Sequence, residues 1–178
     1  MLRRQVKQSG DSSQPGAPRV IVVDDDPDAG RLLGALLRRE GYEVAEIGDH
    51  QVVLVTLQNE PSPIAGVVVS CTAGGSAACL KLLDAVRHTP DRQVSDMALL
   101  LVLDDDQQHR FAWESGADAI LTRPYHEREL VDAVESMIGL GEEARVARRD
   151  HEIARLSETG DSSRTEASTA PTTASLFD

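Results

Sequence analysis

The amino-acid sequence predicts an α/β domain, a doubly wound five-stranded parallel sheet with five helices. Short apolar runs, each suited to one buried strand, alternate along the chain with amphipathic segments at helical spacing. Glycine or a short polar segment separates most of these runs. Strands that alternate with helices form right-handed βαβ units, whose sheet is covered on both sides. The alternating region spans roughly 120 residues, which is a common domain size.

The expected strands are rich in valine, isoleucine and leucine, and the run MALLLVL is wholly apolar, so we expect it to be buried on both faces. The five expected strands cover residues 19–24, 42–47, 64–70, 97–103 and 118–122.

The first helix has clear signals at both of its ends. Pro27 stands at a position that tolerates proline, Asp26 precedes it as an N-cap, and Gly41 ends the helix. Valines within 50–59 favour a strand, but the position of this segment between two strands favours a helix, which we predict. Three further helices are expected at 78–88, 106–115 and 127–138.

The segments outside the predicted domain, which covers residues 18–140, are polar. Residues 1–17 are interrupted by Gly10, Pro15 and Gly16 and are expected to form a flexible arm. Residues 141–156 have mixed charge at helical spacing, which suggests a helical extension that is either solvated or bound to a partner. Residues 157–178 are dominated by serine, threonine, alanine and charge, and are expected to be a disordered tail.

The overall composition excludes several classes of function. The net charge of -12 argues against nonspecific nucleic-acid binding by the whole chain. No apolar run could span a membrane, and the basic N-terminus lacks the apolar core of a secretory signal, so a cytoplasmic location is expected. Two cysteines, Cys71 and Cys79, make no disulfide framework there and no CxxC metal motif. We expect no cofactor.

Functional residues of such a sheet gather at the carboxyl ends of the strands. The polar and flanking residues at these positions are Asp24, Asp25, Asp26, Ser70, Cys71, Leu103, Asp104, Thr122 and Arg123.

Three segments together resemble the receiver domain of bacterial two-component response regulators. These segments are VIVVDDDP at the first strand, LKLLDAVR after the third, and GADAILTRPY around the fifth. The resemblance covers about residues 18–140 and implies the flavodoxin-like, receiver type of the predicted fold. It also implies that an acidic pair, here Asp24 and Asp25, holds Mg²⁺.

The same resemblance shows that the chemical positions are changed. The phospho-accepting aspartate falls on Cys71, or on Ser70 with a shift of one residue. The hydroxyl residue that ends the fourth strand falls on Leu101 or Val102. The lysine before a usually cis proline is replaced by Arg123, before Pro124.

These changes predict a degenerate phosphorylation site. Aspartyl phosphorylation needs a carboxylate nucleophile and Mg²⁺, and a thiol is a poor Mg²⁺ ligand. We expect Arg123 to bridge to Asp24 or Asp25 and to occupy the old metal site. The alternative is a residual cation site at these two aspartates.

In receivers, the usual partner surface corresponds here to 106–115, 118–122 and 127–138. The candidate residues on this surface are His109, Arg110, Ile120 and Tyr125. Phe111 and Trp113 are expected to pack in the core.

We therefore expect a non-enzymatic, atypical, stand-alone response regulator, a pseudo-receiver that works by phosphorylation-independent protein–protein interaction. Its protein partner is unidentified, a homodimer is left open, and neither nucleic acid nor a membrane is expected to bind directly. Alternatives are a thiol redox switch through Cys71, a surviving phosphoryl acceptor at Asp26 or Ser70, and a receiver that responds to a small ligand. A redox role for Cys71 competes with simple burial, and Cys79 is expected to lie too far away to pair with it.

Overall fold

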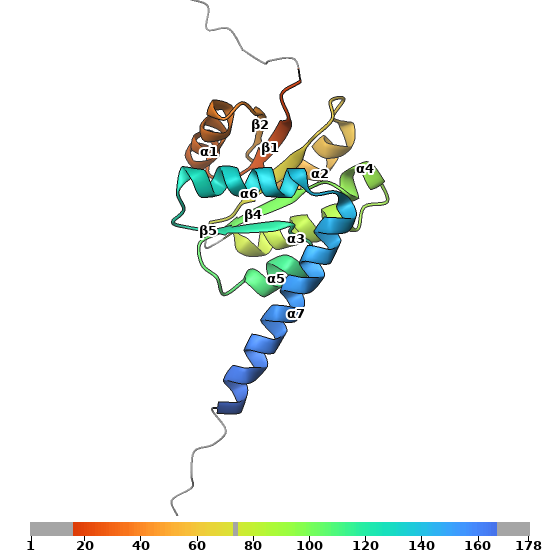
Figure 1. The fold of residues 1–178 in the computed structure, drawn as a ribbon. Helices are drawn as coiled ribbons and strands as arrows, with labels where there is room; N and C mark the ends of the chain where they lie inside the picture. Colours follow the sequence, from red (N-terminus) through yellow and green to blue (C-terminus); the bar gives the residue numbers. More distant parts are fainter. Residues whose placement is uncertain (1–15, 73–74, 167–178) are drawn as a thin grey trace, which may run out of the picture.

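The computed structural model describes residues 16–72 and 75–166, which form one parallel sheet with helices on both sides (Figure 1). The strand order is β2-β1-β3-β4-β5, and all four pairings are parallel. The predicted fold class is therefore confirmed. The strands are β1 (Arg19–Val23), β2 (Glu43–Ile47), β3 (Gly66–Ser70), β4 (Leu99–Leu103) and β5 (Ala119–Thr122).

The described residues form seven helices rather than the five expected. The two additional helices are the short α4, which precedes β4, and the long α7, which follows the domain. The helices are α1 (Pro27–Arg39), α2 (His50–Asn59), α3 (Ser76–Arg87), α4 (Arg92–Ser95), α5 (His109–Glu114), α6 (Glu127–Gly139) and α7 (Glu142–Glu166).

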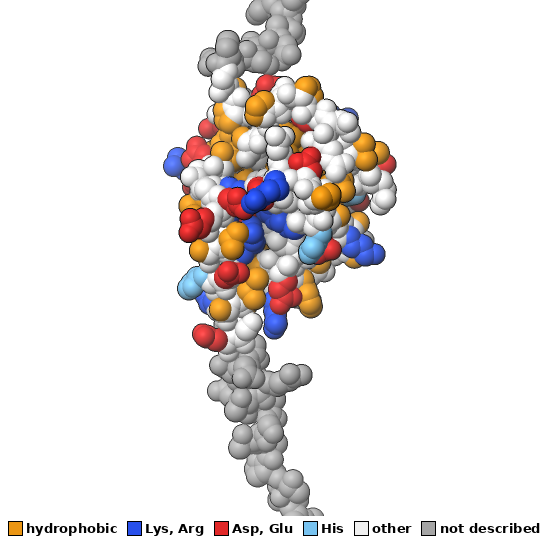
Figure 2. Space-filling view, turned by 90° about the vertical axis from the view of Figure 1, so that its right-hand side faces the viewer, with side chains coloured by type: hydrophobic (Ala, Val, Ile, Leu, Met, Phe, Trp, Pro, Cys, Tyr) orange, Lys and Arg blue, Asp and Glu red, His pale blue; other side chains and the backbone are white. Residues whose placement is uncertain are grey.

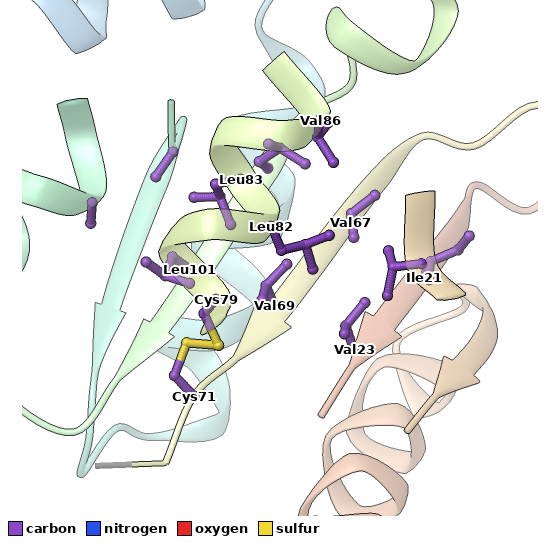
Figure 3. Close-up of a cluster of buried hydrophobic side chains, with 14 of the residues drawn as sticks. Ile21, Val23, Val67, Val69, Cys71, Cys79, Leu82, Leu83, Val86 and Leu101 are labelled. Carbon is purple, nitrogen blue, oxygen red and sulfur yellow. A yellow bond between two sulfur atoms is a disulfide. The ribbon is translucent and has the colours of Figure 1, made fainter. Parts of the chain in front are cut away.

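Two apolar clusters fill the layers between the sheet and its helices. Side chains that alternate along each strand point to opposite faces, so one set packs under α1 and α6 and the other under α2, α3 and α5. Figure 3 shows the second cluster, in which Val67 and Val69 of β3 lie against Leu82 and Leu83 of α3. The strands β3 and β4 are buried along their whole length, and for β4 the apolar run MALLLVL predicted this burial.

Local signals explain how α1 and α2 begin. Asp26 Oδ1 accepts hydrogen bonds from the backbone N–H groups of Asp28 and Ala29, at 2.9 and 3.4 Å. Asp49 caps α2 in the same way through the N–H of Gln51, at 2.8 Å. These caps satisfy backbone N–H groups that have no partner inside a helix. The valine-rich segment 50–59 thus forms the helix α2, as predicted.

The chain continues as helix well beyond the predicted domain. The extension expected over 141–156 is α7, which runs on to Glu166 and projects away from the sheet (Figure 1). The prediction of a disordered tail is therefore wrong for residues 157–166, because α7 is anchored on α5 and continues from there. Residues 167–178, and residues 1–15 of the expected arm, lie outside the described part of the chain.

Candidate functional site

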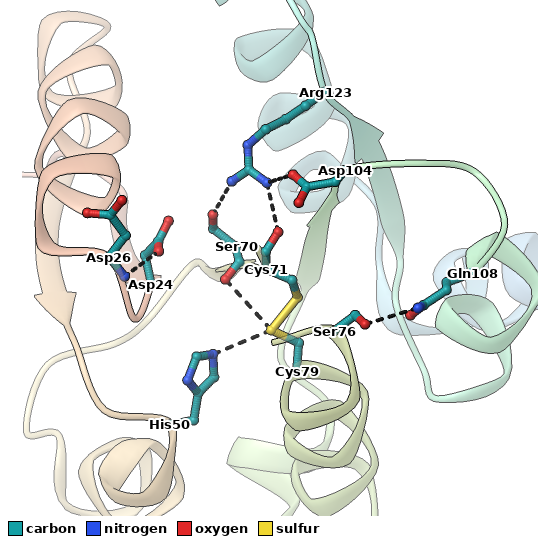
Figure 4. Close-up of a disulfide and its surroundings, with 10 residues drawn as sticks. All are labelled: Asp24, Asp26, His50, Ser70, Cys71, Ser76, Cys79, Asp104, Gln108 and Arg123. Atoms are coloured by element: carbon teal, nitrogen blue, oxygen red, sulfur yellow. Dashed lines mark hydrogen bonds and ion pairs between the residues drawn. A yellow bond between two sulfur atoms is a disulfide. The ribbon is translucent and has the colours of Figure 1, made fainter. Parts of the chain in front are cut away.

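The carboxyl ends of β1, β3, β4 and β5 bring the predicted polar residues to one edge of the sheet (Figure 4). Asp24 directly follows β1, and Ser70 is the last residue of β3, where it pairs with Val102. The two central strands under the site, β3 and β4, are themselves fully buried, which fixes the backbone that carries Ser70 and Asp104.

Asp24 is a buried carboxylate with one unused oxygen. Its side chain is almost fully buried, and its Oδ1 accepts a hydrogen bond from the N–H of Asp26 at 2.9 Å. Its Oδ2 has no hydrogen-bond partner within the described residues. Asp25, the second member of the acidic pair, is exposed.

Arg123 makes contacts that differ from those predicted. Its Nη1 donates to the backbone oxygen of Cys71 and to Asp104 Oδ1, both at 2.8 Å, and its Nη2 donates to Ser70 Oγ at 2.5 Å. The predicted bridge to Asp24 or Asp25 is therefore wrong. The planar fork of arginine is satisfied instead by acceptors at the ends of β3 and β4. The Arg123–Pro124 peptide bond is cis, as the resemblance implied.

Cys71 is not a free thiol, because it forms a disulfide with Cys79. The two Cα atoms lie 6.2 Å apart, within the usual range for a disulfide. The prediction that Cys79 lies too far away is wrong because the chain turns tightly before α3. The N–H of Gly75 bonds the oxygen of Thr72 at 2.7 Å, and α3 begins at Ser76, which turns Cys79 back onto β3.

The two sulfur atoms lie in the core, and Cys79 has a polar neighbour there. Cys71 and Cys79 are 1% and 0% exposed. His50 of α2 places its Nε2 3.4 Å from Cys79 Sγ. A cavity of about 30 Å³, which is space for roughly one water, lies on the other side, next to Cys71.

The two candidates for the receiver hydroxyl position are apolar residues of β4. Leu101 and Val102 are fully buried and belong to the two opposite apolar clusters. A hydroxyl residue, Thr122, ends β5, and its Oγ1 lies 2.7 Å from His109 Nε2. This pair ties α5 to β5, and no sequence pattern indicated it.

The end of β3 offers Mg²⁺ no free side-chain oxygen. This ion is bound through oxygen atoms, usually those of one or two carboxylates together with waters and phosphate oxygens. The Ser70 hydroxyl is engaged by Arg123, and the Cys71 sulfur is bonded to Cys79, which leaves Asp24 and Asp25. Within the described residues, no group of three or more histidine, cysteine or acidic side chains could hold a metal ion.

Known proteins with similar sequences are bacterial regulators. No protein-family model matches the sequence. The chain is 29% identical over 144 residues to the DNA-binding response regulator MtrA of Mycolicibacterium smegmatis, covering 80% of this chain and 57% of the relative. It is 30% identical over 127 residues to the transcriptional regulatory protein AruR of Pseudomonas aeruginosa, covering 68% and 49%. The chain thus spans about half the length of these relatives.

Solved structures with a similar fold include response regulators as well. The chemotaxis response regulator CheY4 of Vibrio cholerae superposes with a TM-score of 0.56 at 18% identity, covering 68% of this chain and 98% of that one. A putative response regulator of Chloroflexus aurantiacus superposes with a TM-score of 0.59 at 23% identity, covering 70% and 99%. This chain carries a CheY-like receiver domain. The crevice residues described above thus lie at the strand ends of a receiver fold.

Tyr125 lies between the charged groups of this receiver crevice. Burial raises the pKa of its phenol, Arg123 acts to lower this pKa, and Asp24 acts to raise it. The ring is partly buried against the apolar cluster under α1 and α6.

The candidate partner residues of the receiver differ in exposure. Arg110 is exposed and pairs with Glu114 at 2.8 Å, whereas His109, Ile120 and Tyr125 are partly buried. Phe111 is 59% exposed, so its predicted place in the core is wrong, while Trp113 is buried as predicted. The short α5 turns Ala112 and Trp113 inward, which leaves Phe111 on the outside.

At the other end of the receiver sheet, a buried cluster of charges was not predicted. Asp118 precedes β5 and is completely buried, and its Oδ2 accepts a hydrogen bond from the N–H of Leu99 at 2.9 Å. Arg87 donates to the same oxygen at 2.7 Å, Arg145 Nε lies 3.4 Å from it, and Arg149 binds Oδ1. We call these four charged residues the Asp118 cluster.

The Asp118 cluster joins α7 to the receiver domain. Arg145 and Arg149 come from α7, and Arg148 between them stacks over the Trp113 ring at 5.9 Å. Burial lowers the pKa of the Arg87 guanidinium, and Asp118 opposes this effect. Gly116, at φ +99°, allows Arg87 to approach, because a Cβ there would lie 2.5 Å from Arg87 Cγ. Two sequence signals could have indicated this cluster. They are the aspartate before β5 and the arginines at helical spacing in 142–156.

Proposed function

We propose that this receiver is a non-enzymatic signalling protein that acts through phosphorylation-independent contact with another protein. The observation that carries the proposal is the end of β3. There the Ser70 hydroxyl accepts a hydrogen bond from Arg123, and the Cys71 sulfur is used in a disulfide. Neither side chain offers the carboxylate that aspartyl phosphorylation requires.

The neighbouring positions support the same proposal. A transferred phosphoryl group needs its charge neutralised, and the end of β3 adds no carboxylate to Asp24 and Asp25 for the metal ion that would do so. Leu101 and Val102 offer no hydroxyl to link a phosphoryl group to β4. Arg123 is also held by Asp104, whose carboxylate would compete with any phosphoryl group for the guanidinium.

The proposed partner surface is the face formed by α5, β5 and α6. Arg110 and Phe111 are exposed on α5, so an aromatic side chain and a guanidinium are both available there. These residue types are enriched in protein interfaces. The anchored α7 lies against α5, so it forms one border of this face (Figure 1).

A membrane or a nucleic acid is not the partner that we propose. No helix in the described part of the chain is long and apolar enough to cross a membrane. Figure 2 shows one face of the molecule, on which acidic and basic side chains lie next to one another. On the α4 side, Arg92 pairs with Asp96 at 3.5 Å and lies 3.8 Å from Glu142 of α7. Basic groups that alternate with acidic ones in this way do not form the continuous positive surface that nucleic acid requires.

The test is an amide NMR titration of the labelled full chain with Mg²⁺ and beryllofluoride, a mimic of the phosphoryl group. We expect no saturable shifts at Asp24, Ser70, Cys71 or Leu101. Saturable shifts that spread into β4 and β5 would overturn the proposal.

A matched variant provides the positive control. Ser70→Asp places a carboxylate beside Asp24 and Arg123, and adds the oxygen donors that Mg²⁺ prefers. We expect this variant to show Mg²⁺-dependent shifts at residues 24 and 70 that the natural sequence lacks. If the natural protein responds as strongly as the variant, the site is not degenerate.

A further inference from the structure

We propose that Cys71 and Cys79 form a redox-active pair whose oxidation state controls the geometry of the Arg123 crevice. The pair would be modified by a peroxide or by a low-molecular-weight disulfide. This inference rests on the proposed function, because it supplies an input at the position where other receivers accept phosphate. The bond joins the end of β3 to the first turn of α3.

The contacts of the Ser70–Cys71 peptide connect the sulfur atoms to the crevice. On one side, Cys79 Sγ lies 3.7 Å from the backbone oxygen of Ser70. On the other side, Arg123 donates to the backbone oxygen of Cys71 and to Ser70 Oγ. The end of β3 is therefore held between the disulfide and Arg123 (Figure 4). Loss of the bond frees this end from α3 and changes the acceptors that hold Arg123.

From Arg123 the change can reach the proposed partner face. Arg123 also holds Asp104, which begins the segment between β4 and α5. The neighbouring Thr122 binds His109 at the start of α5. A movement of Arg123 would therefore pass to α5 through side chains that are in direct contact.

The oxidation balances without any bound cofactor. The thiolate of one cysteine attacks hydrogen peroxide, whose O–O bond breaks to give a sulfenic acid and water once a proton is taken up. The second thiolate then attacks that sulfur, the S–S bond forms, and the hydroxide leaves as water. Two electrons pass from the two sulfur atoms to the peroxide, and the two thiol protons end in water.

His50 favours Cys79 as the leaving sulfur atom when the disulfide is reduced. A dithiol reductant attacks Cys71 Sγ, which borders the small cavity, and the S–S electron pair leaves on Cys79 Sγ. The imidazole of His50 lies beside that sulfur and, when protonated, stabilises the departing thiolate. The second thiol of the reductant then releases Cys71 and becomes a disulfide itself. Both sulfur atoms are buried, so we expect slow exchange.

The expected location of the protein favours a regulatory role for the bond. Disulfides in reducing compartments are usually transient and serve catalysis or redox sensing. In the cytoplasm, which is the location expected from the sequence, this bond is therefore better suited to redox sensing than to a purely structural role.

The test uses the labelled full chain, equilibrated with graded dithiothreitol or hydrogen peroxide. Intact mass after maleimide trapping counts the reactive thiols. We expect two thiols in the reduced protein and none after peroxide. We also expect amide shifts at Asp104, Thr122 and His109, besides those at residues 70–80. Failure of the bond to form, or shifts confined to residues 70–80, would overturn the inference.

Three variants separate the steps of the mechanism. The double variant Cys71→Ala with Cys79→Ala should match the reduced spectrum and ignore peroxide. Arg123→Gln should keep the disulfide, so that the thiol count is unchanged, but lose the redox-dependent shifts at Asp104 and His109. Redox-dependent shifts that persist at these two residues in Arg123→Gln would contradict the route through Arg123. His50→Gln should slow reduction several-fold, and an unchanged rate would contradict the role of the imidazole.

The same samples distinguish failure of this inference from failure of the proposed function. Mg²⁺ and beryllofluoride are added to the oxidised and to the reduced protein. A saturable response in either form overturns the phosphorylation-independent function, whereas redox-dependent shifts would still support control by the cysteines. Absence of redox-dependent shifts at β4, β5 and α5 overturns redox control and leaves the proposed function in place.

Discussion

Arginines meet aspartates at both ends of β5, in two different environments. Before the strand, the carboxylate of Asp118 is fully buried and is surrounded by Arg87, Arg145 and Arg149. After the strand, Arg123 and Asp104 remain 28% and 35% exposed. A buried charge that loses its partner is costly, whereas a solvated pair is nearly neutral in energy. The Asp118 cluster is therefore suited to hold α7 in place, and the Arg123 crevice is suited to rearrange.

The largest expected effect comes from breaking the buried cluster. Asp118→Ala leaves three arginines around a site with no carboxylate, so we expect a loss of about 3–5 kcal/mol in the free energy of unfolding. Asp104→Ala is the matched change at the other end and should cost about 0.2–1 kcal/mol. Urea unfolding of both variants measures the difference. Equal losses would show that the two ends are not energetically distinct, and Asp118→Asn serves if the alanine variant does not fold.

A smaller effect is expected from the α7 side of the same cluster. Arg145 is buried, and it donates to the backbone oxygens of Leu140 and Asp96 as well as pairing with Asp118. Arg145→Ala leaves these acceptors without a donor, so we expect a loss of about 1–3 kcal/mol.

Arg92→Ala is the matched control for Arg145→Ala. The Arg92 side chain is 81% exposed, and it pairs with Asp96 and Glu142 at the same junction. We expect little change in its unfolding free energy. Hydrogen exchange of the α7 amides should increase in Arg145→Ala and stay unchanged in Arg92→Ala. Unchanged exchange in both variants would contradict the anchoring of α7 by the cluster.

The smallest expected effect is a change in the pKa of Tyr125, beside the Arg123 crevice. Arg123 acts to lower the pKa of Tyr125 against the effect of burial, so Arg123→Gln should raise this pKa further. Tyr42 is the internal control, because burial, Glu135 and Glu40 raise its pKa and Arg123 does not contribute. NMR titration of the two tyrosine rings, which are the only ones in the chain, checks this result. A parallel shift of both rings would contradict it.

Because these tyrosine pKa values are raised by folding, they contribute to a fall in stability at alkaline pH. The folded protein retains the phenolic protons at a pH where the unfolded chain has lost them, since the unfolded pKa is about 10. The contribution is complete below that pH, and it is lost as pH rises through the higher folded pKa. Arg123→Gln should move the end of this loss to a higher pH.

The contrast between the two ends also explains what could be predicted from the sequence. The five strands and their helices follow from the alternation of apolar runs and from local signals such as Asp26 and Gly41, which act on neighbouring residues. The crevice residues were located because parallel strands end at a common edge. Leu101 and Val102 were expected to be buried because they lie within a continuous apolar run, and both are.

The contacts that the sequence did not predict depend on how the fold places side chains in space. Arg123 was expected to reach Asp24 or Asp25, but the sheet places Ser70 and Asp104 within its reach. The disulfide depends on how tightly the chain turns before Ser76, which the glycine-rich sequence leaves open. The Asp118 cluster brings together residues 31 positions apart along the chain, and no local pattern reports such a meeting.

The anchored α7 has a geometric consequence. A helix of 25 residues is a rod of roughly 37 Å at 1.5 Å per residue. Because its first turns are fixed by Arg145 and Arg149, the direction of the rod is set by the sheet. The Glu166 end of the helix is thereby held at a defined distance and bearing from the receiver, and a change in the angle between α5 and the sheet would be magnified along its length.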